Sequence, residues 1–275
     1  MMILLQLENQ TYSKILTTGK PLSIEEYRQL TQDFLMFQYP KFLYPPLAIY
    51  GDTHGSAKDM KHAINNKQFK LLLGDYVDRG PDGVICLQQA IALTVLQLGL
   101  AIRGNHEEFR INQRYGFDKQ LMAAYKENYQ EALDLTLKIY EKLKLFQLIN
   151  SKFGIIMAVH GGVPLNQDLN SLVFLGANKF NKEDILWSDP GTQYRANQRG
   201  AGLEYDKKHF EKWSQKNGVW GVVRGHQVVQ EGFRDDFGDQ RHWTIFSSSS
   251  YVGSKNIGGW MLFDNQKGFQ PQKIN

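Results

Sequence analysis

Short apolar runs that each end in a glycine-rich polar loop recur along this 275-residue chain and limit its possible folds more than any other feature. Five such runs occur: 47–50 before GDTHG, 71–73 before GDYVDRG, 100–102 before RGNHE, 155–159 before HGG and 219–223 before RGH. Continuous apolar runs of this length are typical of buried strands. In α/β sheets the ligand crevice lies at the carboxyl ends of the strands, so we expect a binding site among these loops.

Helical and further strand patterns fill the rest of the chain. A capping box of Ser23 and Glu26 predicts a lead-in helix that ends before Pro40. The apolar face of this helix is expected to comprise Ile24, Tyr27, Leu30, Phe34 and Leu35. Further helices are expected over 82–98 and along the amphipathic stretch 118–148, where Leu148 lies on an apolar helical face.

The apolar segments 243–246 and 260–263 have the composition of strands. They favour an α/β (α+β) fold, a β-sandwich of mixed sheets flanked by helices, over a simple doubly wound sheet. We expect a single domain over 1–275, with a helical lead-in over 1–45 and a core over 46–265.

Composition argues against several classes of protein. Lys plus Arg number 32 and Asp plus Glu 28, and no basic block occurs, so we expect no nucleic-acid partner. No run of about 18 apolar residues is present, and the apolar start lacks the basic leader of a signal peptide. Cys86, the one cysteine, can form no intrachain disulfide and is expected to be buried. We therefore expect a cytoplasmic monomer without a membrane partner.

Side chains with metal-binding or acid–base chemistry directly follow the apolar runs. They are Asp52, His54, Asp75, Asn105, His106, His160 and His226. Carboxylate, imidazole and amide ligands suit borderline divalent metals such as Mn, Fe or Zn. Two metals about 3.5–4 Å apart can share one carboxylate and hold both the attacking and the leaving oxygen of a phosphoryl group. The pattern therefore indicates a two-metal phosphoesterase. The other histidines, His62, His209 and His242, are interpreted as turn or surface residues.

Several of these loops carry a family signature. GDTHG (51–55), GDYVDRG (74–80) and GNHE (104–107), followed by HGG and RGH, resemble the phosphoprotein phosphatase family of metallophosphoesterases. INQRYGF (111–117), LWSDP (186–190), Arg199-Gly200 and 246–251 extend the resemblance over about 47–263. The resemblance implies a metallophosphoesterase-type sandwich and protein serine/threonine phosphatase activity. It further implies a bare catalytic core of a divergent or prokaryotic-type member.

The resemblance also implies a role for each site residue. One metal ion would be held by Asp52, His54 and Asp75, and the other by Asp75, Asn105, His160 and His226. His106 would be the general acid, oriented by Asp78, while a hydroxide bridging the metals attacks phosphorus. The substrate phosphate would be bound by Arg79, Arg199, Asn105 and Tyr251. The implied cofactors are two divalent metal ions, manganese in vitro with iron or zinc as alternatives, and the implied substrate is a phosphoprotein or phosphopeptide.

Three other functions remain as alternatives. A bis(5′-nucleosyl)-tetraphosphatase or another small-molecule phosphoesterase would share the metal motifs, but LWSDP, Arg199 and 246–251 favour the protein phosphatase. A nuclease is disfavoured because no basic stripe interleaved with aromatic residues occurs. A non-catalytic phosphoprotein-binding module would be expected to lack a ligand or His106, and none is missing. The stretch 248–252 (SSSYV) departs from the Ser-Ala-Pro-Asn-Tyr-Cys of eukaryotic members, since it lacks the Asn and the Cys, and this loop shapes the substrate mouth.

Overall fold

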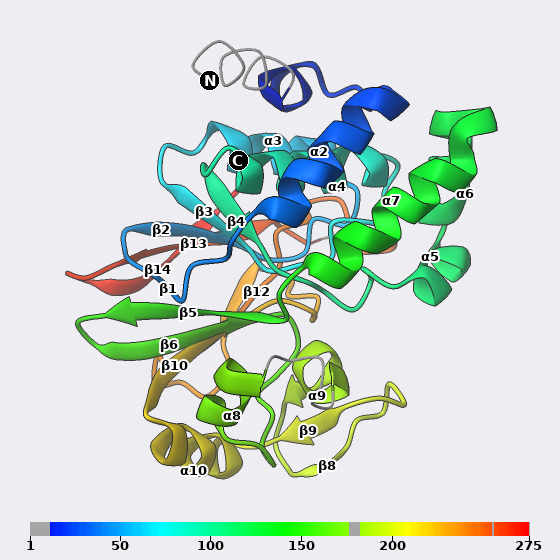
Figure 1. The fold of residues 1–275 in the computed structure, drawn as a ribbon. Coiled ribbons are helices and arrows are strands. Elements are labelled where there is room, and N and C mark those ends of the chain that lie inside the picture. Colours follow the sequence, from blue (N-terminus) through cyan, green and yellow to red (C-terminus); the bar gives the residue numbers. More distant parts are fainter. Residues whose placement is uncertain (1–11, 176–181, 255, 275) are drawn as a thin grey trace.

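Two mixed β-sheets packed against each other form the centre of the molecule (Figure 1). The computed structural model describes residues 12–175, 182–254 and 256–274. The six-stranded sheet has the order β1 (Phe42–Leu43), β5 (Phe146–Ser151), β6 (Gly154–Val159), β10 (Val219–Arg224), β12 (His242–Ile245) and β11 (Phe233–Asp235). The five-stranded sheet has the order β14 (Gly268–Lys273), β13 (Gly259–Asp264), β2 (Leu47–Tyr50), β3 (Phe69–Leu72) and β4 (Gly99–Ala101). The predicted mixed α/β sandwich is confirmed.

Each predicted apolar run forms a strand within two residues of its expected bounds. β2, β3 and β4 are parallel neighbours and are buried on both faces, which explains why their sequences are continuously apolar. The core between the sheets contains Ile49 and Leu71 from one sheet and Ile156, Val223 and Ile245 from the other. Burial of these side chains holds the two sheets together.

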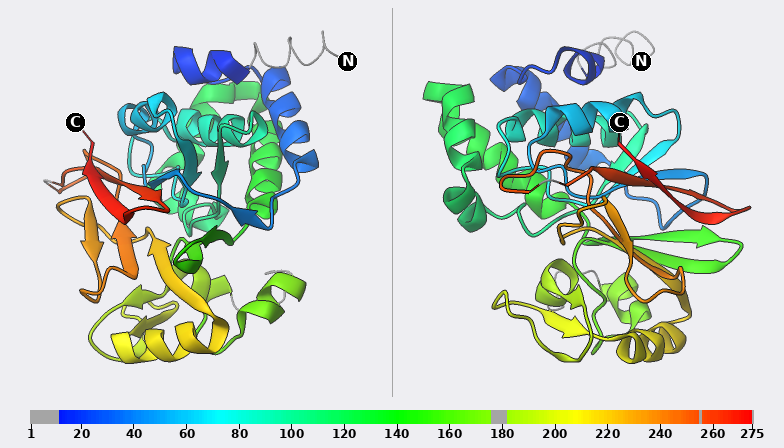
Figure 2. Two further views of the ribbon diagram at one scale, coloured as in Figure 1. Left: turned by 90° about the vertical axis from the view of Figure 1, so that its left-hand side faces the viewer. Right: turned by 180° about the vertical axis from the view of Figure 1, so that it is seen from behind.

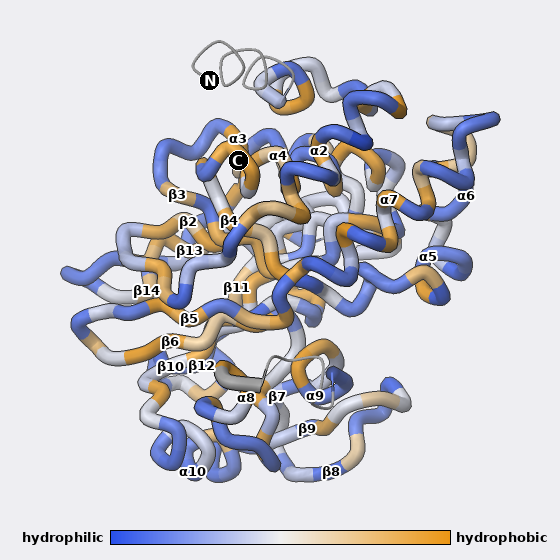
Figure 3. Tube along the Cα trace, in the orientation of Figure 1, coloured by the Kyte–Doolittle hydropathy of each residue, from blue (hydrophilic) through white to orange (hydrophobic). Residues whose placement is uncertain are grey.

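Helices cover the outer faces of both sheets (Figure 2). One group comprises α2 (Ile24–Met36), α3 (Ala57–Asn65), α4 (Gly83–Val95), α5 (Phe109–Tyr115), α6 (Phe117–Tyr125) and α7 (Tyr129–Lys142). The other comprises α8 (Leu169–Leu175), α9 (Lys182–Trp187) and α10 (Lys207–Asn217), beside a small sheet of β7 (Asp189–Pro190), β9 (Leu203–Tyr205) and β8 (Arg195–Ala196). Apolar segments concentrate in the strands, and hydrophilic residues lie on the outer faces of α7 and α10 (Figure 3). Within the described ranges, no helix has both the length and the apolar character needed to cross a bilayer.

The predicted lead-in helix is confirmed as α2. Ser23 accepts a hydrogen bond from the Glu26 backbone, and the Glu26 carboxylate accepts one from the Ser23 backbone, which completes the capping box. The predicted apolar face is buried except for Leu35, which is 36% exposed, so its placement on the core face is wrong. The Tyr27 hydroxyl lies 2.9 Å from the Thr136 hydroxyl of α7, so α2 packs against α7.

The helix expected over 118–148 is wrong in its extent. Lys126 has a positive φ of 47°, at which α6 ends, and a short 3-10 helix over Lys126–Asn128 separates α6 from α7. Leu143 is extended, and from Phe146 the chain forms β5, in which Leu148 lies opposite Met157 of β6. Phe146, Leu148 and Ile149 therefore lie in a strand, because pairing with β6 outweighs the helical spacing of the apolar residues.

Cys86 is buried in α4, as predicted. β13, near the C-terminal end, lies beside β2 although it is far from it in sequence (Figure 2). β14 extends this sheet past residue 265 by pairing with β13 along its whole length.

Candidate active site

A cavity of about 340 Å³ opens where the loops after β2, β3, β4, β10 and β12 meet. The predicted site residues that line it are His54, Asp75, Arg79, Asn105, His106, Arg199, His226 and Tyr251. The predicted residues Asp52, Asp78 and His160 are not exposed to solvent and lie behind its wall. The structure thus brings all the predicted site residues together at the carboxyl ends of the strands.

Backbone conformation in these loops is unusual. His54, Asp75, Asp78, Arg79 and His226 have φ values between 44° and 73°, in the left-handed region that non-glycine residues seldom adopt. Such conformations cost about 1–3 kcal/mol each and cluster at functional sites, where the surrounding structure enforces them. The backbone of these loops is therefore strained in conformations that direct these side chains into the site.

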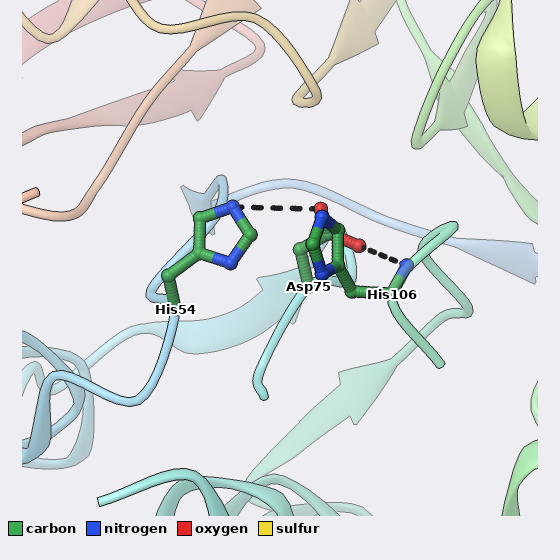
Figure 4. Close-up of side chains that lie close together, drawn as sticks. All are labelled: His54, Asp75 and His106. Carbon is green, nitrogen blue, oxygen red and sulfur yellow. Dashed lines mark hydrogen bonds and ion pairs between the residues drawn. The ribbon is translucent and has the colours of Figure 1, made fainter. Parts of the chain in front are cut away.

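The first group of candidate ligand atoms lies around His54. Its Nε2 is 3.7 Å from Asp52 Oδ2 and 3.6 Å from Asp75 Oδ2. Figure 4 shows His54 and His106 on either side of Asp75. Burial lowers the pKa of His54 to about 4, so its imidazole is neutral and keeps a lone pair for a metal.

The second group lies around Asn105. His160 Nε2 is 3.3 Å from Asp75 Oδ1 and 2.8 Å from Asn105 Oδ1. His226 Nδ1 lies 2.8 Å from the same amide oxygen. Asp75 therefore directs one carboxylate oxygen toward each group, as a carboxylate shared between two cations would.

The electrostatics of these groups call for bound cations. Asp52 Oδ2 is buried and has no hydrogen-bond partner in the described part of the molecule. Burial raises the pKa of Asp52 to about 6, the cost of placing a carboxylate there without a cation. Burial alone would lower the pKa of His160. The carboxylates of Asp75 and Asp52 outweigh this effect and raise the pKa of His160 to about 9. Buried carboxylates beside imidazoles and an amide oxygen fit divalent metal ions.

His106 is held by a buried carboxylate. Its Nδ1 is 2.8 Å from Asp78 Oδ2, which leaves Nε2 free for proton transfer. Asp78 also accepts hydrogen bonds from the Asn112 side chain at 2.9 Å and from the Phe117 backbone at 3.0 Å. Burial would lower the pKa of His106, but Asp75 and Asp78 outweigh it and raise that pKa above its ordinary value. The arrangement suits a group that donates a proton near neutral pH.

Cationic side chains stand at the cavity wall. The Arg79 guanidinium lies over the Tyr115 ring, 3.7 Å from its centroid. Arg199 Nε donates to Asp189 Oδ2 at 2.9 Å, which fixes this guanidinium at the edge of the cavity. The ring of Tyr251 lies 5.1 Å from that of His54. Two arginines beside the ligand groups are suited to bind a phosphate.

Some residues that shape the site have no predicted role. The Glu107 carboxylate accepts hydrogen bonds from the backbone of Asp75, Tyr76 and Gly104, all at 2.8–2.9 Å. It therefore fixes the loop that presents Asp75. Gly104 is required here because a Cβ would lie 2.2 Å from Asp75 Oδ1. Glu107 lies within the GNHE motif, and its place after an apolar run is the signal that could have identified it.

The histidines interpreted as turn or surface residues do not line the cavity. For His242 that interpretation is wrong, because it is fully buried in β12. Its Nδ1 lies 2.8 Å from Asp236 and its Nε2 lies 3.0 Å from the Tyr205 hydroxyl, so it is a core histidine with both nitrogens paired.

Known proteins are similar to this chain in sequence and fold. Residues 45–230 match the model of the calcineurin-like phosphoesterase family. The chain is 32% identical over 226 residues, 76% of its length, to a serine/threonine-protein phosphatase of Caenorhabditis elegans. It spans about half the length of this relative and of a second one from Encephalitozoon cuniculi. It is 31% identical to the serine/threonine-protein phosphatase PP1-delta of C. elegans over 76% of this chain and 72% of that protein.

A solved structure has the same fold. The protein serine/threonine phosphatase from Saccharomyces cerevisiae with similarity to human phosphatase PP5 superposes with a TM-score of 0.82. The match covers 97% of this chain and 96% of that one at 22% identity. This structure shows the shared fold, while the family match and the PP1-delta relative place the chain in the calcineurin-like phosphoesterase family, among the serine/threonine phosphoprotein phosphatases.

Proposed function

We propose that this protein is a metal-dependent serine/threonine protein phosphatase that hydrolyses phosphomonoesters of phosphoproteins or phosphopeptides. The observation that carries the proposal is the position of Asp75. Its two carboxylate oxygens face separate ligand groups, 3.6 Å from His54 and 3.3 Å from His160, in a cavity edged by arginines.

Two divalent cations would occupy the site, and manganese would serve as both in vitro. Asp52, His54 and Asp75 would hold one, and Asp75, Asn105, His160 and His226 would hold the other. When bound, such ions lower the pKa of water and withdraw negative charge from phosphoryl oxygens.

The side chains of the cavity would carry the remaining steps. Arg79 and Arg199 would bind phosphate oxygens and stabilise the charge that they carry during transfer. Tyr251 would donate a hydrogen bond to the phosphate. His106 would hold a proton at Nε2 and transfer it to the serine or threonine oxygen as it leaves, while Asp78 keeps the ring oriented.

A substrate panel tests the proposal. Phosphoserine, phosphothreonine and phosphotyrosine peptides are compared with diadenosine tetraphosphate, each with Mn²⁺ and with a chelator. We expect phosphate release from the phosphoserine and phosphothreonine peptides with Mn²⁺ and none after chelation. Activity confined to the dinucleotide would instead identify a small-molecule phosphoesterase.

Metal binding should also stabilise the fold. Because the ligand groups are assembled only in the folded chain, saturating Mn²⁺ is expected to raise the melting temperature by roughly 5–10 °C. Thermal unfolding of metal-stripped protein with and without Mn²⁺ measures this shift. An unchanged melting temperature at concentrations that support activity would contradict metal binding by the folded state.

Arg199→Ala should weaken substrate binding without removing the metals. Arg199 contacts Asp189 at the cavity edge, and no metal ligand, so KM for a phosphoserine peptide is expected to rise on the order of tenfold. Arg195→Ala is the matched control, because Arg195 pairs with Glu204 on the outer surface and does not line the cavity. Loss of metal from Arg199→Ala, measured by elemental analysis, would show that Arg199 acts on the metal groups instead.

A further inference from the structure

The mouth of the cavity carries a cation that the proposed chemistry does not use. Arg114, near the end of α5, lines the cavity beside Tyr115 and is exposed. Among the described residues, its side chain forms no ion pair or hydrogen bond in the structure. Among the described residues that line this cavity, the only carboxylate belongs to Asp75, a predicted metal ligand. The surface left for the substrate around the phosphate is therefore cationic.

A second hollow of about 180 Å³ adjoins the cavity. The two share His54, Arg79 and Tyr251, so they lie on either side of these side chains. The second hollow extends to the start of α3, where Lys58 is exposed and, within the described ranges, has no ion-pair partner. Among the described residues that line the second hollow, Asp82 is the one with a carboxylate. The two cations Lys58 and Arg79 therefore face a single acidic group there.

The serine-rich loop 247–250 lines the second hollow through Ser248 and Ser250 and is held in place by internal hydrogen bonds. The buried Asp59 carboxylate accepts from the Ser249 backbone at 2.9 Å and from the Ser249 hydroxyl at 2.7 Å. Ser247 donates from its backbone to the Asp52 carbonyl at 3.1 Å. The serine-rich loop is thus anchored both at the Asp52 backbone and at α3.

We propose that Arg114 and Lys58 select phosphorylated segments with acidic side chains close to the phosphorylated residue, one for each flank. This inference rests on the proposed protein phosphatase function. With the phosphate of the substrate beside Asp75, an extended chain rises about 3.3 Å per residue, and the residues before and after the phosphorylated one would lie in the two hollows. Carboxylates there meet unpaired cations, whereas lysine or arginine side chains would be repelled.

Phosphoserine peptides test the selection. Glu, Ala or Lys is placed two residues before or two residues after the phosphoserine, and kcat/KM is measured for each peptide relative to p-nitrophenyl phosphate. We expect the Glu peptides to exceed the Lys peptides by about tenfold at low salt. The preference should shrink when ionic strength rises from about 0.05 M to about 0.5 M, because salt screens exposed charges.

Variants assign each flank. Arg114→Gln is expected to lower the preference for Glu on one flank by about fivefold, and Lys58→Gln by a similar factor on the other. The matched controls are Arg110→Gln on α5 and Lys61→Gln on α3, since both residues are exposed and line neither hollow. Both controls should keep the preference of the unmodified protein.

The outcomes separate the two proposals. Hydrolysis of all phosphoserine peptides at rates within about twofold of one another would overturn the acidic selection and leave the phosphatase function standing. Equal loss of preference in Arg110→Gln or Lys61→Gln would also overturn it, because general surface charge would then suffice. Hydrolysis of p-nitrophenyl phosphate or diadenosine tetraphosphate, with no phosphopeptide turned over, would refute the proposed function itself.

Discussion

Asp75→Asn is expected to lower phosphate release from a phosphoserine peptide on the order of 10³-fold and to reduce bound metal. The substitution keeps the size of the side chain but removes its charge and one ligand oxygen. Asp75 faces His54 at 3.6 Å and His160 at 3.3 Å, so both ligand groups lose an anionic member at once. Elemental analysis and steady-state kinetics on the same preparation measure the two effects.

Asp236→Asn provides a matched control for Asp75→Asn. Asp236 is also a buried carboxylate, and it lies 2.8 Å from Nδ1 of His242. It does not line the cavity. Its substitution is expected to cost stability while the folded fraction keeps its metal and its activity. Full activity of Asp75→Asn with its metal retained would refute the shared-ligand role of Asp75.

His106→Asn should distinguish leaving groups. A serine alkoxide leaves poorly unless it is protonated, so a phosphoserine peptide is expected to lose on the order of 10³-fold in kcat. p-Nitrophenolate leaves without a proton, and its release is expected to fall only about tenfold. The ratio of the two losses, measured at saturating substrate and metal, isolates proton donation from any change in metal binding.

Asp78→Asn should also lower kcat more for the phosphoserine peptide than for p-nitrophenyl phosphate. Both losses should be smaller than for His106→Asn, because Asp78 acts through its 2.8 Å contact to His106. His62→Asn is the control, since His62 lies 3.1 Å from the Tyr50 hydroxyl and outside the cavity. Equal losses of His106→Asn on both substrates would remove His106 as the proton donor.

The clustering of the candidate metal ligands was predictable because it depends on local sequence. Asp52 and Asp75 each follow a buried strand by two or three residues, and the carboxyl ends of parallel strands meet at one edge. The capping box of α2 was predictable for the same reason, since its hydrogen bonds join residues three apart.

Other parts of the site depend on contacts between distant segments. Asn112 is held by Tyr140 of α7 at 3.0 Å and in turn supports Asp78, a chain of contacts with no local signature. Asp189 joins Arg199 to the buried Arg224, two residues before His226. The end of α7 and the start of β5 were also missed, because pairing of β5 with β6 decides them and helical spacing does not.

Metal titration of stripped protein tests the central claim most directly. Mn²⁺ is added in steps to metal-free protein while phosphate release from a phosphoserine peptide is followed. Because Asp75 faces two ligand groups, the rate is predicted to rise fully only as the second equivalent binds. Full activity before any metal is added, or a plateau at one equivalent, would contradict a site that needs two divalent cations.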